Sequence, residues 1–322
     1  MLPLPSEHGQ KLPATPGRPQ QRGAAIITAM LIVGLVAALA TTLLARMNDW
    51  IEDLAIARDK AQATELARNG VAYARQLLIA DAAHSAIDTL DEDWARTLPP
   101  MRHEGAELSG RIVDVQGRFN LNNLRQASGI VDEQAHAAYR RLLIVLGLPA
   151  ELADTLADWL DADDSRRAAG AEASDYATAG ANASGIGRPL SSSGELLRVR
   201  GYTPAIVARL QPHICVLAGI QAINVNTATP EVLSAIQPGL TLANAKTVAA
   251  GRHGLPFRDR SDFRNRLADP GLPSSLLPIS ATSRHFLVDI EVDRKIARSR
   301  VSSLLQRSLD GSRPRILWQS IL

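Results

Sequence analysis

The apolar residues of this chain are most concentrated near its N-terminus. An uncharged stretch of about 23 residues runs from Gly23 to Ala45 and is bounded by Arg22 and Arg46. A helix rises about 1.5 Å per residue, so a stretch of this length can cross the hydrocarbon core of a bilayer. The pattern therefore predicts a transmembrane helix over residues 24–45.

Helical spacing continues beyond this apolar stretch. From Trp50 to about Asp81, apolar residues recur every three or four positions between charged residues, as on one face of an amphipathic helix. An ordinary secretory signal has a short apolar core followed by a cleavage site, and it lacks such a continuation. We expect a single helix over residues 24–82, of which only the first part lies in lipid.

The segment ahead of the helix, residues 1–23, is rich in Pro, Gln and basic residues and cannot form a core. Its Lys11, Arg18 and Arg22 favour a cytoplasmic N-terminus, because basic residues that flank a membrane helix stay in the cytoplasm. The remainder of the chain would then be exported. A plain signal anchor, which only tethers a domain to the membrane, is the alternative that this pattern leaves open.

Alternating apolar and polar residues predict strands at both ends of the exported part. Residues 107–115 and 118–121 have the pattern of a hairpin that turns at Gln116 and Gly117. Three more alternating runs follow near the C-terminus, over residues 283–292, 299–306 and 314–319.

Between these strands the pattern is helical and rich in turns. This order predicts an α+β fold, in which a large α-helical domain over residues 125–280 is inserted into a small antiparallel sheet. Residues 83–124 would form the first part of the α/β unit, and residues 281–322 would supply its C-terminal strands.

Composition adds few constraints. The 35 Lys and Arg residues nearly balance the 33 Asp and Glu residues, so overall charge gives no reason to expect a nucleic-acid partner. The single cysteine, Cys215, excludes an intramolecular disulfide and lies in an apolar run, as a core residue would. The histidines are scattered and no nucleophile motif is present, so we expect no enzyme activity.

The junction between leader and helix resembles the processing signal of type IV prepilin-like proteins. A basic leader ends in Arg22-Gly23, and an uncharged sequence beginning AAIITAMLIV follows directly. The resemblance implies that a prepilin peptidase cuts after Gly23 on the cytoplasmic side and methylates the new N-terminus, Ala24. The apolar helix would then stay on the mature protein as an anchor and as a packing surface for assembly.

Thr28 indicates which class of prepilin-like protein the chain resembles. Most members of the pilin family carry a glutamate at the fifth mature position, where this chain has Thr28. A carboxylate in lipid is costly unless a neighbouring amine pairs with it, whereas Thr28 can bond to its own helix backbone. Among the pseudopilins of type II secretion systems, absence of this glutamate is typical of the large minor subunit of the K class.

Further segments resemble K-class pseudopilins in the same order along the chain. They are Gly117–Leu124, Trp159–Asp164, Gly194–Gly201 and Ile223–Ala228. The resemblance implies a pilin-like helix and sheet interrupted by a large helical domain, with the helix in the bacterial inner membrane and the C-terminal domain in the periplasm.

The same resemblance implies a function in protein secretion. The chain would assemble with other minor pseudopilins, and with the inner-membrane secretion platform, at the tip of a periplasmic pseudopilus. There it would initiate the pseudopilus and support the export of folded proteins across the outer membrane.

Carboxylates crowd into a loop rich in Gly and Ala after Trp159. They are Asp161, Asp163, Asp164, Glu172 and Asp175. Oxygen ligands in a flexible loop suit calcium, and the cluster lacks the His and Cys that zinc prefers. The resemblance also implies calcium, which K-class pseudopilins bind, while the residues alone leave open a solvated turn whose aspartates cap a helix.

The segment from Ile223 to Phe263 resembles a helix-hairpin-helix module, so a membrane-anchored DNA-binding protein is the alternative function. In such modules a Gly-x-Gly hairpin opens a helix whose backbone amides hold phosphate. This chain has Thr241 in place of the second glycine, and Lys246 and Arg252 are the cations nearby. We therefore expect poor phosphate binding and no nucleic-acid partner.

Two Asn-x-Asn segments suggest a degenerate internal repeat. One holds Asn120 and Asn122, and the other precedes the hairpin at Asn224 and Asn226. In the second segment, Asn226 or Thr227 is expected to cap the helix that follows.

Overall fold

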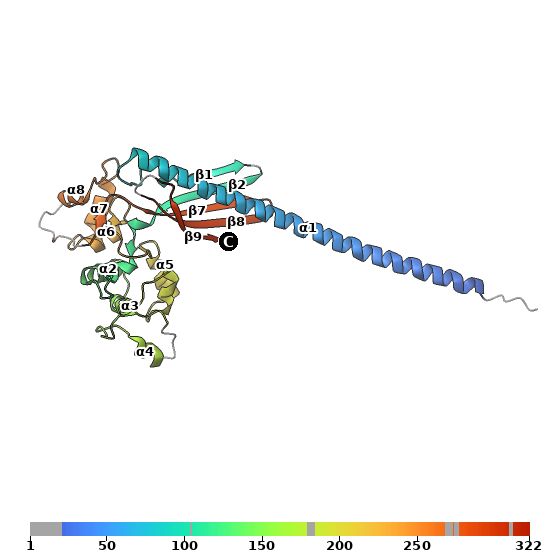
Figure 1. The fold of residues 1–322 in the computed structure, drawn as a ribbon, viewed down its shortest axis with the longest axis horizontal. Helices are drawn as coiled ribbons and strands as arrows, with labels where there is room; N and C mark the ends of the chain where they lie inside the picture. The colour runs from blue at the N-terminus through green and yellow to red at the C-terminus, as the bar shows by residue number, and fades with distance from the viewer. Residues whose placement is uncertain (1–20, 104, 179–183, 268–272, 274–276, 309–311) are drawn as a thin grey trace, which may run out of the picture. The chain divides into compact units, whose positions relative to one another are not determined.

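The computed structural model describes residues 21–103, 105–178, 184–267, 273, 277–308 and 312–322 (Figure 1). The chain divides into two units, residues 1–58 and 59–322. One uninterrupted helix, α1 (Gln21–His84), contributes to both units. This helix confirms the prediction of a single long helix, and most of the expected leader lies outside the described residues.

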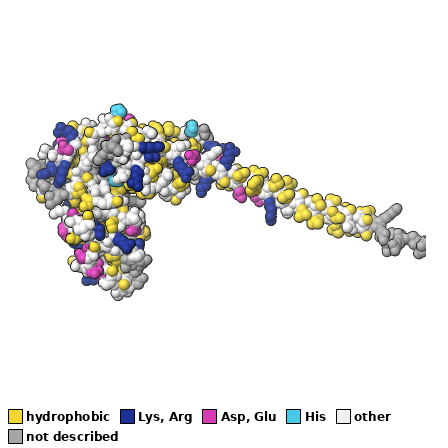
Figure 2. Space-filling model, in the orientation of Figure 1, with side chains coloured by type: hydrophobic (Ala, Val, Ile, Leu, Met, Phe, Trp, Pro, Cys, Tyr) yellow, Lys and Arg dark blue, Asp and Glu magenta, His cyan; other side chains and the backbone are white. Residues whose placement is uncertain are grey.

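The first unit consists, in its described part, of the N-terminal portion of α1. Its large apolar side chains between Ile26 and Leu44 are each more than half exposed. Figure 2 shows many yellow side chains along the outer part of the long helix. The helix is long and apolar enough to cross a membrane. Its exposed apolar surface is what a membrane anchor requires, because lipid rather than protein would cover it.

A five-stranded antiparallel sheet is the frame of the second unit. Its strands follow the order β1-β2-β7-β8-β9. Their bounds are β1 Leu98–His103, β2 Ala106–Asp114, β7 His285–Arg294, β8 Ala297–Gln306 and β9 Arg315–Ile321. The last three confirm the strands that the alternating C-terminal runs predict.

The C-terminal portion of α1 packs against one face of this sheet. Its buried residues Ala63, Ala67, Val71, Ala74 and Leu78 share a core with Phe286, Val288, Ile290, Val301 and Leu305 of the sheet. Small residues let the helix approach closely, since a Cβ atom on Gly70 would lie 2.9 Å from the Ile290 side chain. Burial of this apolar stripe fixes the helix on the sheet.

The predicted hairpin over residues 107–121 is wrong. Strand β2 pairs with β1 on one side and with β7 on the other. After β2, Asp114 accepts a hydrogen bond from the Gln116 backbone and starts a 3-10 turn, η2 (Val115–Gly117), that directs the chain away from the sheet. Phe119 and Asn120 form a separate strand, β3, which pairs in parallel with β4 (Ile214–Cys215).

The α domain consists of two halves with one plan. The first half begins with β3 (Phe119–Asn120), ends with β4, and contains η3 (Leu121–Leu124), α2 (Glu133–Val145), α3 (Leu152–Leu160), α4 (Ala173–Thr178), η4 (Ser193–Arg198) and α5 (Pro204–Leu210). The second half lies between the parallel strands β5 (Ile223–Asn224) and β6 (Ile279–Ser280), and contains α6 (Pro230–Ile236), α7 (Leu242–Gly251) and α8 (Arg260–Asn265). A short 3-10 helix, η1 (Asp93–Ala95), precedes β1.

The two Asn-x-Asn segments make equivalent contacts in the two halves. Asn122 donates to the carbonyl of Leu190 at 2.9 Å and accepts from its N–H at 2.8 Å. Asn226 makes the same pair of bonds with Phe257, both at 2.8 Å. These matching bonds support the internal repeat.

The expected cap at Asn226 or Thr227 is wrong by two or three residues. Helix α6 begins at Pro230, and the Thr229 side chain accepts from the Val232 backbone as its N-cap. Asn226 is instead committed to Phe257. The two halves share one hydrophobic core, in which α2 packs against α6.

Candidate functional site

Three buried carboxylates meet at the end of α3 in the first half of the α domain. Asp158 lies in the last turn of α3, Asp161 follows the helix, and Glu172 returns at the end of the loop. Each is at most 4% exposed, and one oxygen from each lies within 4.8 Å of the others. A Cβ on Gly170 would collide with the Asp158 carboxylate, so a glycine there lets the loop close.

Most of the oxygens of this cluster lack a protein partner. Oδ1 of Asp158, Oδ1 of Asp161 and both carboxylate oxygens of Glu172 are buried and accept no hydrogen bond from the described residues. The nearest cation, Arg167, lies 3.8 Å from Asp158 but also pairs with Glu133. Buried carboxylate oxygens are costly to leave unpaired, so the cluster is suited to a further cation.

The electrostatics of the cluster agree with this geometry. Burial raises the pKa of Asp161 to about 7, and the negative charges of Asp163 and Asp158 add to the effect. Burial likewise raises the pKa of Glu172 to about 7, together with the charges of Asp158 and Asp161. A cation bound between them would favour the charged forms and reverse these shifts.

The predicted ligand set is only partly brought together. Asp161 and Glu172 meet, while Asp163 and Asp164 are exposed, and Asp163 accepts from the Ser165 backbone within its own turn. Asp175 accepts from the Glu172 backbone at 2.9 Å and pairs with Arg166.

Asp158 is the site residue that sequence reasoning missed. It precedes Asp161 by three positions, and this spacing places the two side chains on one face of a helical turn. The spacing is the signal that could have found it. The Asp158, Asp161 and Glu172 set offers oxygen atoms alone, and hard cations such as calcium prefer oxygen.

The hairpin between α6 and α7 lacks the features that hold phosphate. Gly239 has a positive φ of 80° and turns the chain, but Thr241 uses its side chain to cap α7 by accepting from the Asn244 backbone. Arg252 is buried and donates to the carbonyls of Val225 and Ala228 at 2.9 and 2.6 Å. One of the two cations near the hairpin is therefore committed inside the domain.

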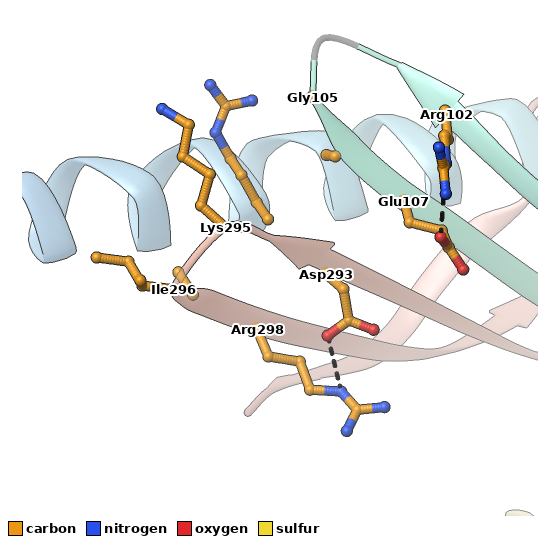
Figure 3. Close-up of a pocket in the computed structure, with 10 residues that line it drawn as sticks. Arg102, Gly105, Glu107, Asp293, Lys295, Ile296 and Arg298 are labelled. Atoms are coloured by element: carbon orange, nitrogen blue, oxygen red, sulfur yellow. Dashed lines mark ion pairs between the residues drawn. The ribbon is translucent and has the colours of Figure 1, made fainter.

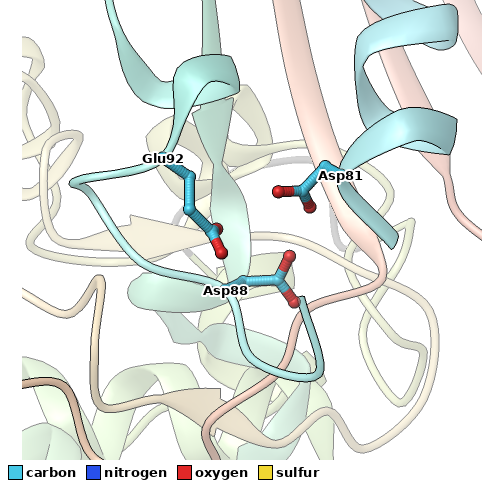
Figure 4. Close-up of side chains that lie close together, drawn as sticks. All are labelled: Asp81, Asp88 and Glu92. Carbon is cyan, nitrogen blue, oxygen red and sulfur yellow. The ribbon is translucent and has the colours of Figure 1, made fainter. Parts of the chain in front are cut away.

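A second carboxylate group links the end of α1 to the loop before β1. It consists of Asp81, Asp88 and Glu92, whose side chains point toward one another in Figure 4. Arg307 donates to Asp81 at 2.9 Å and to Asp88 at 2.6 Å, and Glu92 accepts from the Trp94 indole at 2.7 Å. These carboxylates have protein partners, so the group is an ion-pair network of the structure rather than a candidate metal centre.

The hairpin ends at the other side of the sheet carry paired charges. A cleft of about 520 Å³ lies between the β1–β2 and β7–β8 turns (Figure 3). Arg298 pairs with Asp293 at 3.2 Å, and Arg102 lies 3.9 Å from Glu107. Carboxylates therefore offset the basic residues here, as on a solvated sheet surface.

The remaining sequence features have structural explanations. Burial raises the pKa of the Cys215 thiol to about 12, as expected of an unreactive core residue. The Thr28 hydroxyl donates to the carbonyl of Ala24 at 2.7 Å, which is the backbone bond expected from its position. Gly23 and Ala24 lie in the first turn of α1.

Comparison with known proteins places these features in one family. Two family models, both described as "Type II secretion system (T2SS), protein K", match residues 117–219 and 223–281, which correspond to the two halves of the α domain. Type II secretion system protein K of Pseudomonas aeruginosa is 33% identical over 306 residues, covering 90% of each chain. This chain belongs to the type II secretion system protein K family.

Another relative and a solved structure are similar to this chain over most of its length. Protein K of Klebsiella pneumoniae is 30% identical over 308 residues, covering 89% of this chain and 93% of that protein. A chain of the crystal structure of the GspK-GspI-GspJ complex from enterotoxigenic Escherichia coli has the same fold, with a TM-score of 0.69 at 22% identity. That match covers 82% of this chain and 97% of the other.

Membership of the protein K family decides between the functional alternatives. The chain is a minor pseudopilin, a component of a type II secretion system, and its apolar helix has the length and composition of a membrane anchor. The comparisons give no support to the DNA-binding alternative.

Proposed function

We propose that this chain caps the tip of a periplasmic pseudopilus, where it assembles with other minor pseudopilins and initiates the filament as a noncatalytic subunit. In this way it would support export of folded proteins across the outer membrane. The observation that carries the proposal is the place of the α domain within the second unit.

The α domain lies at the end of the sheet where α1 finishes. Asp59, early in the packed part of α1, pairs with Arg294 at one end of β7, whereas Asp81 pairs with Arg307 beyond the other end of the sheet. The chain leaves the sheet after Asp114, whose register partner is Phe286, so the insertion starts at the Asp81 end. A bulky domain at the finishing end of the helix would block addition of a further subunit there.

The proposed partners are other minor pseudopilins of the same secretion system. The solved complex whose fold this chain shares contains GspI and GspJ together with GspK. Small residues along the N-terminal helix, such as Gly34, Ala37 and Ala38, would permit close helix packing in lipid during assembly.

Coexpression of the full chain with the other minor pseudopilins of its own system tests this function. Purification in mild detergent should yield a stable complex containing this chain, and cells that lack the chain should lose pseudopili and secretion. A complex that forms and initiates pseudopili equally well without this chain would contradict the proposal.

We further propose that prepilin peptidase processes the chain after Gly23 and methylates Ala24. The basic leader and the uncharged helix that begins at this point support it, and they favour a single-pass orientation in the inner membrane with a cytoplasmic N-terminus. Mass spectrometry of the purified protein should find a methylated N-terminal Ala24. Recovery of a chain that still starts at Met1 would contradict this processing.

We also propose that the Asp158, Asp161 and Glu172 cluster binds calcium. Its support is the set of buried carboxylate oxygens that accept no hydrogen bond from the described part of the chain. Calcium bound there would neutralise the cluster and hold the loop of residues 162–171 against α3, which would stabilise the first half of the α domain.

Calorimetric titration of the chelator-treated full chain with calcium tests this site. The double variant Asp161→Asn with Glu172→Gln should lose binding, whereas Asp163→Asn at an exposed position should keep it. Circular dichroism controls for folding of each variant. Equal calcium affinity in the double variant and the wild type would remove the site.

A further inference from the structure

The two edges of the five-stranded sheet differ in how they are protected against pairing with another chain. At one edge, β1 contains Pro99 and Pro100, which lack backbone donors, and its register is broken between Leu98 and Met101. Prolines and irregularities of this kind prevent edge-to-edge association. At the other edge, β9 has one register shift, between Ile316 and Trp318, but it contains no proline and no charged residue from Ile316 to Ile321.

The side chains of β9 are open on both faces. Every residue of the strand is exposed, and Trp318 and Leu317 are 46% and 41% exposed. Because successive side chains of a strand point to opposite faces, neither face is covered by the described residues of this unit. A long, uncharged, apolar edge is an aggregation hazard unless a partner covers it.

The backbone of β9 also has a free side. Arg300 and Leu322 exchange two hydrogen bonds of 2.9 Å each, so they form a bonded pair between β8 and the end of β9. Bonded and non-bonded pairs alternate along an antiparallel ladder. The N–H and C=O groups of Gln319 and Ile321 therefore point away from β8, toward the open edge.

Charge around β9 indicates the kind of strand that fits this edge. Arg313 and Arg315 lie where the strand begins, and Arg300 neighbours its end. Among the described residues, no carboxylate pairs with Arg313 or Arg315. In an antiparallel pairing of two copies centred on Trp318, Arg315 of one copy would lie opposite Ile321 of the other, and residues 313–321 contain no Asp or Glu. A second copy would therefore bring no carboxylate to offset Arg313 and Arg315.

We propose that β9 accepts an extended strand from another minor pseudopilin, apolar at its centre and carrying Asp or Glu where it passes Arg313 and Arg315. This inference rests on the proposed function, since it names the surface through which that assembly forms. Backbone hydrogen bonds along Gln319 and Ile321 would give affinity, and burial of Leu317 and Trp318 would add apolar contact.

Hydrogen exchange in detergent tests this surface. It is measured on the full chain alone and on the full chain in the purified complex with the other minor pseudopilins. The amides of Gln319 and Ile321 should exchange at least about tenfold more slowly in the complex, since a bonded amide exchanges only when the pairing opens. Exchange rates that do not change in an intact complex would overturn the inference while leaving the proposed function in place.

Two variants with a matched control sharpen the test. Gln319→Lys places a charge on the edge and should lower the affinity of the complex by about tenfold or more, whereas Gln319→Thr should retain it. Arg315→Glu should weaken a complex that depends on partner carboxylates. Equal affinity in all three variants would contradict the strand pairing.

The same experiment separates the remaining outcomes. Protection of Gln319 and Ile321 that appears in the isolated chain as its concentration rises would identify a second copy as the occupant and overturn the proposal. Failure of the wild-type chain to form any complex would overturn the proposed function together with this surface.

Discussion

Asn122 and Asn226 explain at the residue level why the α domain contains two Asn-x-Asn segments. Each side-chain amide has an NH2 group that donates and an oxygen that accepts, and each uses both groups on the backbone of one distant residue, Leu190 or Phe257. The NH2 group of Asn122 also donates to the carbonyl of Leu217. The side-chain amide thus makes the pair of hydrogen bonds that a backbone residue of a neighbouring strand would make. Both side chains are at most 3% exposed, so water cannot replace these bonds.

Asn226→Ala should lower the free energy of unfolding by about 3 kcal/mol, because the N–H and C=O of Phe257 would lose their partners while buried. Urea denaturation of the full chain in detergent measures the change. Asn244→Ala, at an exposed position of α7, is the matched control and should change stability by less than about 0.5 kcal/mol. Similar losses in the two variants would show that the bonds to Phe257 contribute little.

Thr28 is a second residue whose role follows from its partner. Because its hydroxyl is satisfied by the carbonyl of Ala24, the position needs no amine from a neighbouring subunit. Thr28→Glu should therefore leave secretion intact or reduce it modestly, as measured by export of a reporter substrate. Thr28→Val is the control for loss of the hydroxyl alone. A large gain of secretion with glutamate would contradict the tip position.

At the scale of elements, the periodicity of apolar residues predicted the helices and strands that depend on local pattern, and it missed pairings between distant parts of the chain. In helix α1 and in strands β7 to β9, the spacing of apolar residues is visible within a few turns or residues. The sequence was therefore sufficient to predict these elements. Strand β1 was not predicted, because a sequence that contains Pro99 and Pro100 is not typical of a strand. Residues 118–121 alternate because Phe119 and Leu121 enter the α-domain core, and their true partner, β4, is far along the chain.

The calcium candidate shows the same limit. The sequence shows that several carboxylates lie close together along the chain. The folded loop, which passes Asp158 closely at Gly170, brings only Asp161 and Glu172 of these together and adds Asp158 to them. Spacing along a sequence cannot distinguish carboxylates that turn inward from those, such as Asp163 and Asp164, that stay in water.

Gly117 shows why the junction between sheet and α domain begins with a glycine. A Cβ atom at this position would lie 2.8 Å from the backbone carbonyl atoms of Thr227, which cannot move as a side-chain end can. Gly117→Ala should destabilise the chain by about 2 kcal/mol or more through this overlap. Thermal unfolding measures it against Gly194→Ala, where the nearest atom is 3.6 Å away. Equal melting temperatures would show that the junction adjusts.

At the scale of the whole second unit, one polar network joins helix, sheet and α domain. Asp114, at the end of β2, accepts from Asn224 at 3.1 Å and from the hydroxyls of Thr227 and Ser283 at 2.5 and 2.6 Å. Close by, Ser283 donates its backbone N–H to Asp88 at 2.7 Å, which continues the network to Arg307 and α1. Asp81 and Asp88 share one arginine, Arg307, and Asp114 and Glu92 add further carboxylates nearby, so negative charge is in excess.

This excess makes the stability of the metal-free chain depend on pH. Burial raises the pKa of Asp81 from 3.8 to about 7, with the charges of Glu92 and Asp88 adding to it against the opposing effect of Arg307. The folded state therefore holds a proton that the unfolded state releases between these values. The unfolding free energy should be highest at acidic pH, fall as pH rises toward about 7, and then level off.

Asp81→Asn should flatten this fall, because the amide cannot ionise. One carboxyl accounts for at most about 1.4 kcal/mol per pH unit. Asp88, Asp161 and Glu172, whose pKa values burial also raises, would leave part of the slope. Urea denaturation from pH 5 to pH 8 with chelator present measures it, and Asp93→Asn at an exposed position is the control. If the slope of Asp81→Asn equals that of the wild type, Asp81 stays charged throughout. Arg307 then balances it, and the pH dependence comes from other buried carboxyls such as Asp88.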